Sequence, residues 1–341
     1  MRVKQRYLWF SMAVCTSMLL CGCVSEKMQK AEPMPTQALE DQYAQTVPCS
    51  QEPTHVMPEE TVSGQIEIPE EKYVTKDPWY SSGRLVYHAC GGIDGVSYSN
   101  SKEALESTLA AGNMLVEVDF LYTTDGHLVC LHKWIDMLPV WKYKELKRKY
   151  KDKEDQIPET QYTLDQFLIK KVKGKFTGLT AADIVSYMKE NPELHIVVDT
   201  KEENLTAVIA DLLKLSDFQP DIIDRFIIQL YDRGQRENIL ELYPFPRENF
   251  LFTCYKFDPL RVDEILELCR DEQIGVVTVS HGSWEAETVN LFLEQGITVF
   301  EHTVNLPEQV ELSLEKGIYG FYTDFLQISE LNDIIYQKME Q

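Results

Sequence analysis

Short apolar runs alternate with amphipathic segments along the chain from about residue 79 onward. The apolar runs have the length and the β-branched content of buried strands, and they cover residues 85–88, 114–119, 127–131, 195–199, 226–230, 250–254, 276–280, 298–302 and 320–323. Helical patterns lie between most of them, at residues 101–111, 181–190, 205–215, 263–270, 284–294 and 307–316. This alternation predicts an α/β fold, specifically a closed (β/α)8 barrel of the TIM type. Nine strand candidates for eight barrel strands leave one extra, which the pattern does not identify.

Polar and ionisable residues recur where the predicted strands end. In a barrel of this type the C-terminal ends of the strands converge on one rim, where catalytic groups gather. The residues at or just past these ends are His88, Glu117, Asp119, His132, Asp199, Lys201, Gln229, His302, Asn305, Thr323 and Asp324. Their recurrence on many strands predicts a functional site at this rim.

Glu117 and Asp119 interrupt a strand that is otherwise apolar. Residues two apart on a strand share a face, and an unpaired buried carboxylate is costly, so we expect a positive charge beside them. A lysine at the rim is one candidate. A divalent cation is the other, because hard cations favour oxygen ligands. A third carboxylate, Asp199, ends a different strand and favours the cation.

Residues 135–178 depart from the alternation and form a long insertion directly after His132. Between Lys142 and Lys175 the insertion has 11 basic and 6 acidic residues, a net charge of +5. Two interpretations stay open: a lid or docking surface for anionic head groups, or a solvated helical face.

The N-terminus has the pattern of an export signal. Arg2, Lys4 and Arg6 precede an apolar run over residues 7–20, which is shorter than the roughly 20 residues of a membrane-spanning helix. With the following Cys-Gly-Cys it resembles a bacterial lipoprotein signal: residues 1–22 would be the signal peptide and Cys23 the lipidated first residue. The alternative is an uncleaved signal anchor. We therefore expect a membrane-anchored lipoprotein of the cell envelope, outside the cytoplasm.

Residues 23–78 are rich in Glu, Gln, Pro, Ser and Thr and have little apolar periodicity. Such a composition predicts a flexible tether, which leaves residues 79–341 for the barrel.

The charge and the cysteines argue against three kinds of protein. Thirty-three Lys and Arg against 55 Asp and Glu give a net charge of −22, which argues against a nucleic-acid partner. Outside the predicted signal and Cys23, five of the eight cysteines remain, an odd number without a CxxC spacing. Neither a disulfide framework nor a zinc site is supported.

Three blocks of the sequence resemble a known family. YHACGGIDGVSYSNSKEALESTLAAGNMLVEVDFLYTTDGHLVCLHKW, which begins at Tyr87, resembles the opening of the glycerophosphodiester phosphodiesterases, close to the branch with a His-Ala-Gly-Gly motif. IVVDTK resembles the family's later acidic strand, and ITVFEHTVNLPEQVELSLEKGIYGFYTDF resembles its closing strands. The blocks occur in family order over residues 85 to about 335.

The resemblance implies a (β/α)8 barrel that hydrolyses glycerophosphodiesters to glycerol phosphate and an alcohol. Two histidines would transfer protons, with a divalent cation, usually calcium or magnesium, as cofactor. The matched residues are His88 and His132 for catalysis; Glu117, Asp119 and Asp199 for the metal; and Asn100, near the metal, and Lys201, facing the phosphate, for the substrate.

Four positions depart from the family pattern. Ala89 replaces an arginine, Cys90 a glycine and Lys133 an aspartate, while His302 stands where a tryptophan usually packs on the glycerol moiety. These changes leave the substrate open. Alternatives are a phospholipase acting on intact lipids, which the anchor and the basic insertion would suit, and a non-catalytic surface lipoprotein that binds phosphorylated ligands.

Overall fold

The computed structural model describes residues 78–81, 83–151, 153, 156–254 and 261–340. All of them lie in a compact unit that spans Glu71–Gln341. The predicted signal peptide, Cys23 and the predicted tether through residue 77 lie outside the described residues. Within the described residues, no helix combines the length and the apolar character needed to cross a membrane.

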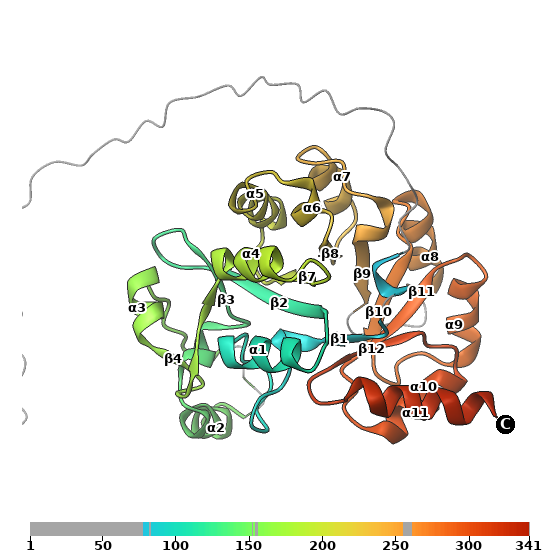
Figure 1. Ribbon diagram of the computed structural model, residues 1–341, viewed down its shortest axis with the longest axis horizontal. Helices are drawn as coiled ribbons and strands as arrows, with labels where there is room; N and C mark the ends of the chain where they lie inside the picture. Colours follow the sequence, from blue (N-terminus) through green and yellow to red (C-terminus); the bar gives the residue numbers. More distant parts are fainter. Residues whose placement is uncertain (1–77, 82, 152, 154–155, 255–260, 341) are drawn as a thin grey trace, which may run out of the picture. The chain divides into compact units, whose positions relative to one another are not determined.

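Eight parallel strands close into a barrel, as predicted (Figure 1). They are β1 (Leu85–Tyr87), β2 (Leu115–Tyr122), β7 (His195–Thr200), β8 (Phe226–Leu230), β9 (Phe250–Cys254), β10 (Val276–Ser280), β11 (Thr298–His302) and β12 (Gly320–Thr323). Each pairs with the next in this order, and β1 pairs with both β12 and β2, which closes the ring.

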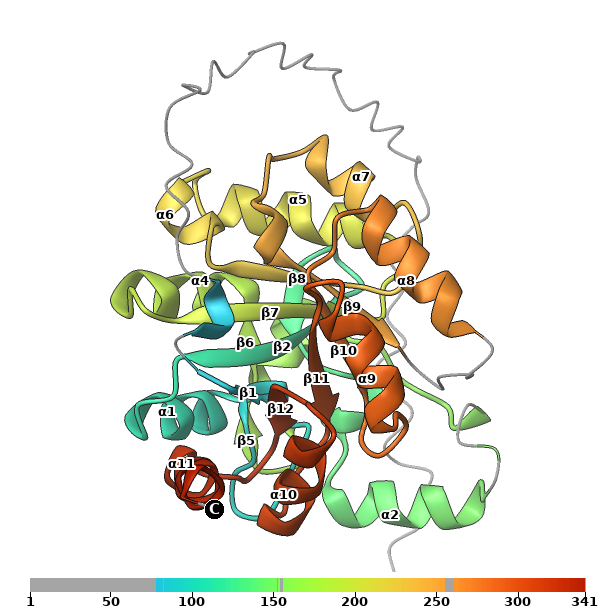
Figure 2. The same cartoon turned by 90° about the vertical axis from the view of Figure 1, so that its right-hand side faces the viewer.

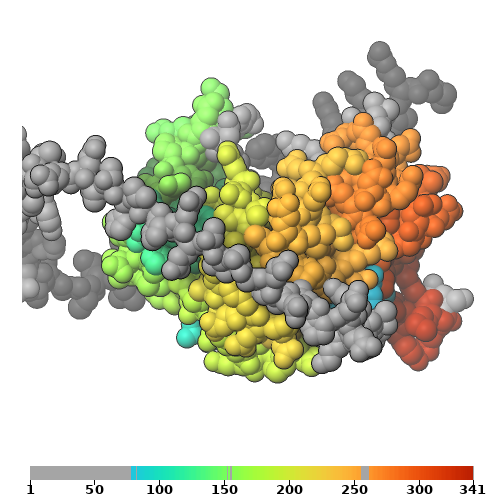
Figure 3. Space-filling view, turned by 90° about the horizontal axis from the view of Figure 1, so that it is seen from above, coloured from blue at the N-terminus to red at the C-terminus, as the bar shows by residue number. Residues whose placement is uncertain are grey.

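Helices surround the barrel (Figures 1 and 2). They are α1 (Lys102–Ala110), α4 (Ala181–Glu190), α5 (Leu205–Leu215), α6 (Pro220–Ile223), α7 (Gln235–Leu240), α8 (Val262–Asp271), α9 (Ala286–Leu293), α10 (Pro307–Glu315) and α11 (Ile328–Met339). Local side-chain hydrogen bonds determine where helices begin; for example, Thr180 and Asp183 form a capping box at the start of α4. Their apolar faces pack on the outward side chains of the strands in one large core. From above, Figure 3 shows the yellow and orange segments that contain α5 to α8 on one face of the molecule.

The extra strand among the nine predicted ones is β3 (Leu128–Cys130), which is not part of the ring. It pairs antiparallel with the far end of β2, which runs on past the predicted end at Asp119 to Tyr122. The turn between them contains Gly126, whose φ of 81° favours glycine. The extra strand is therefore half of a hairpin, and the short strand β6 (Leu179–Thr180) extends it.

Apolar side chains fill the interior of the barrel. Val86, Val197, Leu251 and Phe300 belong to this inner cluster. Trp79, in the short helix η1 (Trp79–Ser81), packs against it with its ring 5.5 Å from that of Phe300, and its Nε1 donates to the Glu248 carbonyl at 2.7 Å. The interior is a packed core, so the polar groups are left to the rim.

The insertion has a small core of its own. It contains the short helix η3 (Trp134–Met137), α2 (Val140–Lys149), α3 (Leu164–Ile169), β4 (Lys171–Val172) and β5 (Phe176–Thr177). Trp134, Phe167 and Phe176 pack with Leu131 and Val129 of the hairpin. This layer stands beside the barrel, on the side where β2 extends past the ring (Figure 1).

Candidate active site

Three carboxylates meet at the rim. Glu117 and Asp119 lie on β2, and the parallel register places Asp119 opposite Asp199 of β7. All three are buried, and one oxygen atom of each lies within 4.8 Å of the others. The structure therefore brings together the three residues that the sequence predicted as metal ligands.

A divalent cation fits this cluster. The Oδ1 atom of Asp119 is buried and, within the described part of the chain, has no hydrogen-bond partner. Burial, and then the charge of the neighbouring carboxylates, raises the pKa of Glu117 well above its usual value and that of Asp119 to about 7. Hard oxygen ligands that repel one another in a buried site suit calcium or magnesium. The alternative of a rim lysine paired with Glu117 or Asp119 is not what the described residues show, because no described ion pair reaches either carboxylate. The nearby Lys201 pairs with Asp199 instead, with its Nζ 3.2 Å from Oδ2.

Backbone and amide groups hold the two carboxylates of β2. The Ala89 N–H donates to Glu117 Oε2 at 2.5 Å, and Asn100 Nδ2 donates to Asp119 Oδ2 at 2.8 Å. Asn100 also accepts from the Asp119 N–H at 3.0 Å, so it lies beside the carboxylate cluster, as predicted from the family. Cys90 has a φ of 70°, in the region that favours glycine. The backbone at Cys90 therefore keeps a conformation that suits the glycine of the family, which strains the chain close to His88.

His88 starts the short helix η2 (His88–Cys90) directly after β1. Its Nδ1 lies 3.0 Å from Oδ1 of Asp324, and Asp324 Oδ2 in turn accepts from Asn305 Nδ2 at 2.9 Å. Burial lowers the pKa of His88, but the hydrogen bond to Asp324 and the charges of Glu117, Asp324 and Asp119 outweigh it and raise the pKa to about 9. At neutral pH, His88 is a protonated acid.

His132 follows β3, and its pKa is shifted in the opposite direction to that of His88. Burial, then the positive charges of Lys201 and Lys133, lowers its pKa to about 3. Its Nδ1 lies 3.9 Å from Oδ2 of Asp136, which forms an ion pair with the buried Lys173. A neutral and a protonated histidine at one site are the arrangement expected of a general base and a general acid.

One tyrosine contacts both histidine rings. The ring centroid of Tyr98 lies 4.3 Å from that of His88, edge to face, and 4.8 Å from that of His132. Tyr98 has a φ of 54°, which is unusual for a bulky residue. The two predicted catalytic histidines, 44 residues apart in the sequence, therefore meet around a single side chain.

The two other predicted substrate residues border the same site. Lys201 lies above the ring of Tyr231 at 5.4 Å, and the Tyr231 hydroxyl donates to Asp199 at 2.5 Å. His302 ends β11, with its ring nitrogens 3.1 Å from Thr278 Oγ1 and 3.3 Å from Ser280 Oγ. Burial, and next the charge of His88, lowers the pKa of His302 to about 4, so it is neutral at pH 7.

The sequence assigned no role to four residues that contact the site. Asp324 stood out only as a strand end, whereas Tyr98, Asp136 and Tyr231 gave no signal. Asp324 and Tyr231 contact the site across distant segments, whereas Asp136 comes from the insertion that follows His132. The only available hint was that Asp324 follows β12, the strand beside β1 and His88.

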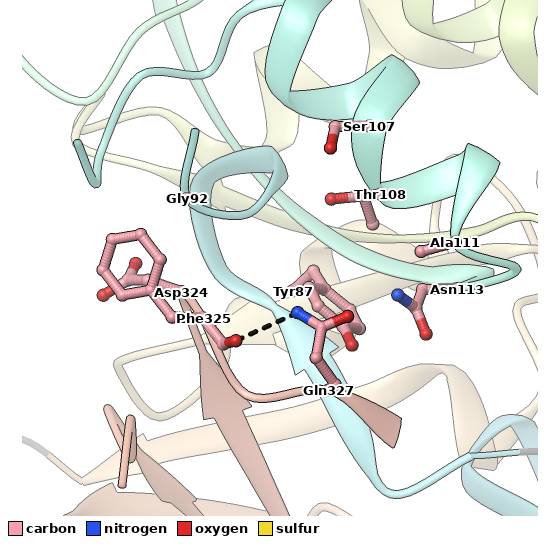
Figure 4. Close-up of a pocket in the computed structure, with 9 residues that line it drawn as sticks. All are labelled: Tyr87, Gly92, Ser107, Thr108, Ala111, Asn113, Asp324, Phe325 and Gln327. Atoms are coloured by element: carbon pink, nitrogen blue, oxygen red, sulfur yellow. Dashed lines mark hydrogen bonds between the residues drawn. The ribbon is translucent and has the colours of Figure 1, made fainter. Parts of the chain in front are cut away.

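A small pocket lies between the end of β1, α1 and the segment after β12 (Figure 4). Its volume is about 80 Å³, and its lining residues are Tyr87, Gly92, Ser107, Thr108, Ala111, Asn113, Asp324, Phe325 and Gln327. Among its lining residues, Gln327 Nε2 donates to the Phe325 carbonyl at 3.1 Å (Figure 4). None of the three clustered carboxylates lines it, and it shares only Asp324 with the histidine site. The pocket is therefore separate from the carboxylate cluster.

A barrel with clustered carboxylates and a pair of histidines on its C-terminal rim defines a class of phosphoric diester hydrolases. The model of the glycerophosphoryl diester phosphodiesterase family matches residues 92–328. The chain belongs to this family, which confirms the resemblance of its sequence blocks.

Solved structures share the fold. A phosphodiesterase from Oleispira antarctica, in complex with the product sn-glycerol-3-phosphate, is 14% identical with a TM-score of 0.58, covering 76% of this chain and 99% of its own. A glycerophosphodiester phosphodiesterase from Parabacteroides distasonis is 15% identical with a TM-score of 0.52, covering 75% of this chain and 98% of its own. No curated protein matches the chain.

Proposed function

We propose that this protein hydrolyses glycerophosphodiesters to glycerol phosphate and an alcohol. The observation that carries the proposal is the pair of histidines, with pKa values shifted in opposite directions, beside three buried carboxylates. Family membership supports the reaction class, and the product named in the Oleispira antarctica complex supports the substrate class.

His132 is the base and His88 the acid. As an attacking hydroxyl forms its bond to phosphorus, the neutral imidazole of His132 takes its proton. As the bond from phosphorus to the leaving oxygen breaks, protonated His88 gives its proton to that oxygen. Asp324 accepts from Nδ1 of His88, so the proton on Nε2 is the one available for transfer. Each proton transfer contributes about 10²- to 10⁴-fold to the rate.

Glu117, Asp119 and Asp199 would hold the divalent cation, with calcium and magnesium as candidates. When bound, the cation supplies charge stabilisation for the phosphoryl oxygens. Lys201 adds a second positive charge on the same side of the site, since it lies beside Asp199. Asn100 fixes Asp119 through two hydrogen bonds.

The test is the release of alcohol and glycerol phosphate from a panel of glycerophosphodiesters by the full chain. We expect turnover with calcium or magnesium, none with a chelator, and a loss of about 10²- to 10⁴-fold in His88→Ala and in His132→Ala. His127→Ala is the matched control, because His127 is exposed in the hairpin turn. A folded protein that binds cation but turns over no member of the panel would overturn the proposal.

Two alternatives have their own outcomes. Faster turnover of bilayer phospholipids than of soluble glycerophosphodiesters would identify a phospholipase. Tight binding of phosphorylated glycans or lipids without any turnover would identify the non-catalytic lipoprotein.

We also propose that the protein is a lipoprotein of the cell envelope, anchored in the membrane through Cys23. The supporting pattern is the basic start, the short apolar run and the small residue before Cys23. Labelling with a radioactive fatty acid tests it: we expect label on the natural chain and on Cys21→Ser, and none on Cys23→Ser. Equal labelling of Cys23→Ser would contradict the proposal.

A further inference from the structure

The helix α2 of the insertion is strongly basic. Its ten residues, VWKYKELKRK, include five Lys or Arg and one Glu, a net charge of +4. The whole chain has a net charge of −22. At physiological ionic strength charges are screened beyond about 8 Å, so a local positive surface acts independently of the acidic remainder.

One face of α2 is exposed to solvent. Trp141, Lys144, Glu145 and Arg148 are all exposed, and their spacing of i, i+3, i+4 and i+7 places them along one side of the helix. We name these four residues the α2 stripe. The charge of Glu145 is compensated by Lys142, whose Nζ lies 3.0 Å away. The net character of the stripe is therefore cationic with one large aromatic residue.

Packing of the opposite side of α2 against the insertion keeps the α2 stripe exposed to solvent. Tyr143 and Leu146, on the other side of α2, are half-buried. The ring of Tyr143 lies 5.5 Å from Nζ of Lys173, the residue buried against Asp136. Gly174 packs closely against Pro139, the residue before α2, since a Cβ at Gly174 would lie 2.9 Å from Pro139. This contact holds the start of the helix.

Trp141 is the unusual member of the stripe, since it is 67% exposed. A tryptophan seldom leaves so much apolar surface in water, and its amphipathic ring is enriched at membrane interfaces. Tryptophan together with Lys and Arg on an exposed helix is the composition that binds anionic lipid surfaces. The same insertion exposes two further apolar residues at the end of α3, Leu168 at 50% and Ile169 at 82%.

We propose that the α2 stripe is a docking surface for an anionic lipid bilayer. The charge of the stripe complements anionic head groups, and Trp141 inserts between them. Because α2 begins at Val140, eight residues after His132, docking would bring the rim of the barrel close to the lipid surface. The green insertion that stands out from the yellow and orange helical surface in Figure 3 is the part of the chain that would make this contact.

Co-sedimentation with vesicles tests the proposal, without substrate and thus independently of the phosphodiesterase activity. The full chain is mixed with phosphatidylcholine vesicles, or with vesicles of phosphatidylcholine and phosphatidylglycerol, at low and high salt. We expect at least tenfold tighter binding to the anionic vesicles, lost at high salt. We expect Trp141→Ala, and the double variant Lys144→Glu/Arg148→Glu, to remove at least tenfold of that preference.

The matched control is Lys214→Glu/Lys338→Glu, which makes the same change in net charge on α5 and α11. It should retain the preference. An equal loss in the control would show that only net charge matters, and equal binding to both kinds of vesicle would assign the contact to the N-terminal apolar run. Complete displacement by polyphosphate with no effect of Trp141→Ala would identify a soluble polyanion as the partner. Each of these results overturns the proposal.

Discussion

The Oδ2 atom of Asp136 lies 3.9 Å from Nδ1 of His132. Within the described part of the chain this oxygen is buried without a hydrogen-bond partner, while the other oxygen pairs with Lys173. The family resemblance places an aspartate directly after the second histidine, and here Lys133 has replaced it. Asp136, four residues downstream in the insertion, therefore supplies a carboxylate near His132 in place of the missing aspartate. A small movement would shorten the separation of 3.9 Å to a hydrogen bond.

Asp136→Asn should lower kcat about tenfold with little change in KM. The amide cannot stabilise the imidazolium that forms when His132 takes a proton, whereas Asp136 is buried and is not exposed to bind substrate. The variant should also melt earlier, because breaking a buried ion pair typically costs about 3–5 kcal/mol. Steady-state kinetics on the folded protein check this, with Asp165→Asn on exposed α3 as control. An unchanged kcat would show that Asp136 has only a structural role.

Asp324→Asn should move the alkaline limb of the pH profile to lower pH. The hydrogen bond and the charge of Asp324 help to raise the pKa of His88 to about 9, and the asparagine removes the charge while keeping the shape. His88 must be protonated to act as the acid, so activity in the natural protein falls as pH rises through the pKa of His88. Measuring kcat/KM between pH 6 and 10 checks the shift. An alkaline limb that does not move would assign it to another group.

Metal-free protein should lose stability as pH rises from about 6.5 to 9. The pKa values of His88, at about 9, of Asp119, at about 7, and of Glu117, well above its usual value, are all raised by folding. In this pH range the folded state therefore holds more protons than the unfolded state, and the free energy of unfolding falls with pH.

Thermal melts in chelator and in excess calcium or magnesium check this. A cation at 100 times its dissociation constant should add about 2.7 kcal/mol, and the added stability should be largest at pH 9, where the carboxylates are most ionised. Glu117→Gln should weaken both the pH dependence and the response to cation. Melts that are independent of pH and of cation would argue against metal binding by this cluster.

Gly320→Ala should destabilise the barrel by about 1–3 kcal/mol. A Cβ at Gly320 would lie 2.7 Å from the Arg84 carbonyl oxygen and 2.3 Å from the ring of Phe300. The backbone contact belongs to the β12–β1 seam, which cannot shift without opening the ring. Gly83→Ala is the matched control, because no atom lies within 4 Å of its Cβ and a change below about 0.5 kcal/mol is expected. Denaturant titrations compare the two; equal midpoints would contradict the prediction.

The sequence by itself determined the elements and the chemical inventory. Strands such as Val276–Ser280 and helices such as Leu205–Leu215 have unbroken local periodicity, so their predicted bounds agree with the structure. Glu117 and Asp119 were conspicuous because carboxylates are costly in a buried strand. Repeated strand–helix alternation was enough for the barrel, because few folds accommodate it.

Only the tertiary structure decided the partners of the two histidines and the directions in which their pKa values shift. The hairpin assignment of β3 depends on pairing with the extended end of β2, and the contact between His88 and Asp324 spans 236 residues across the seam where β1 pairs with β12. The opposite shifts of the pKa values of His88 and His132 depend on burial and on charges from other segments. These properties depend on distances between segments and on the exclusion of water, which follow from packing of the whole chain and leave no local pattern in the sequence.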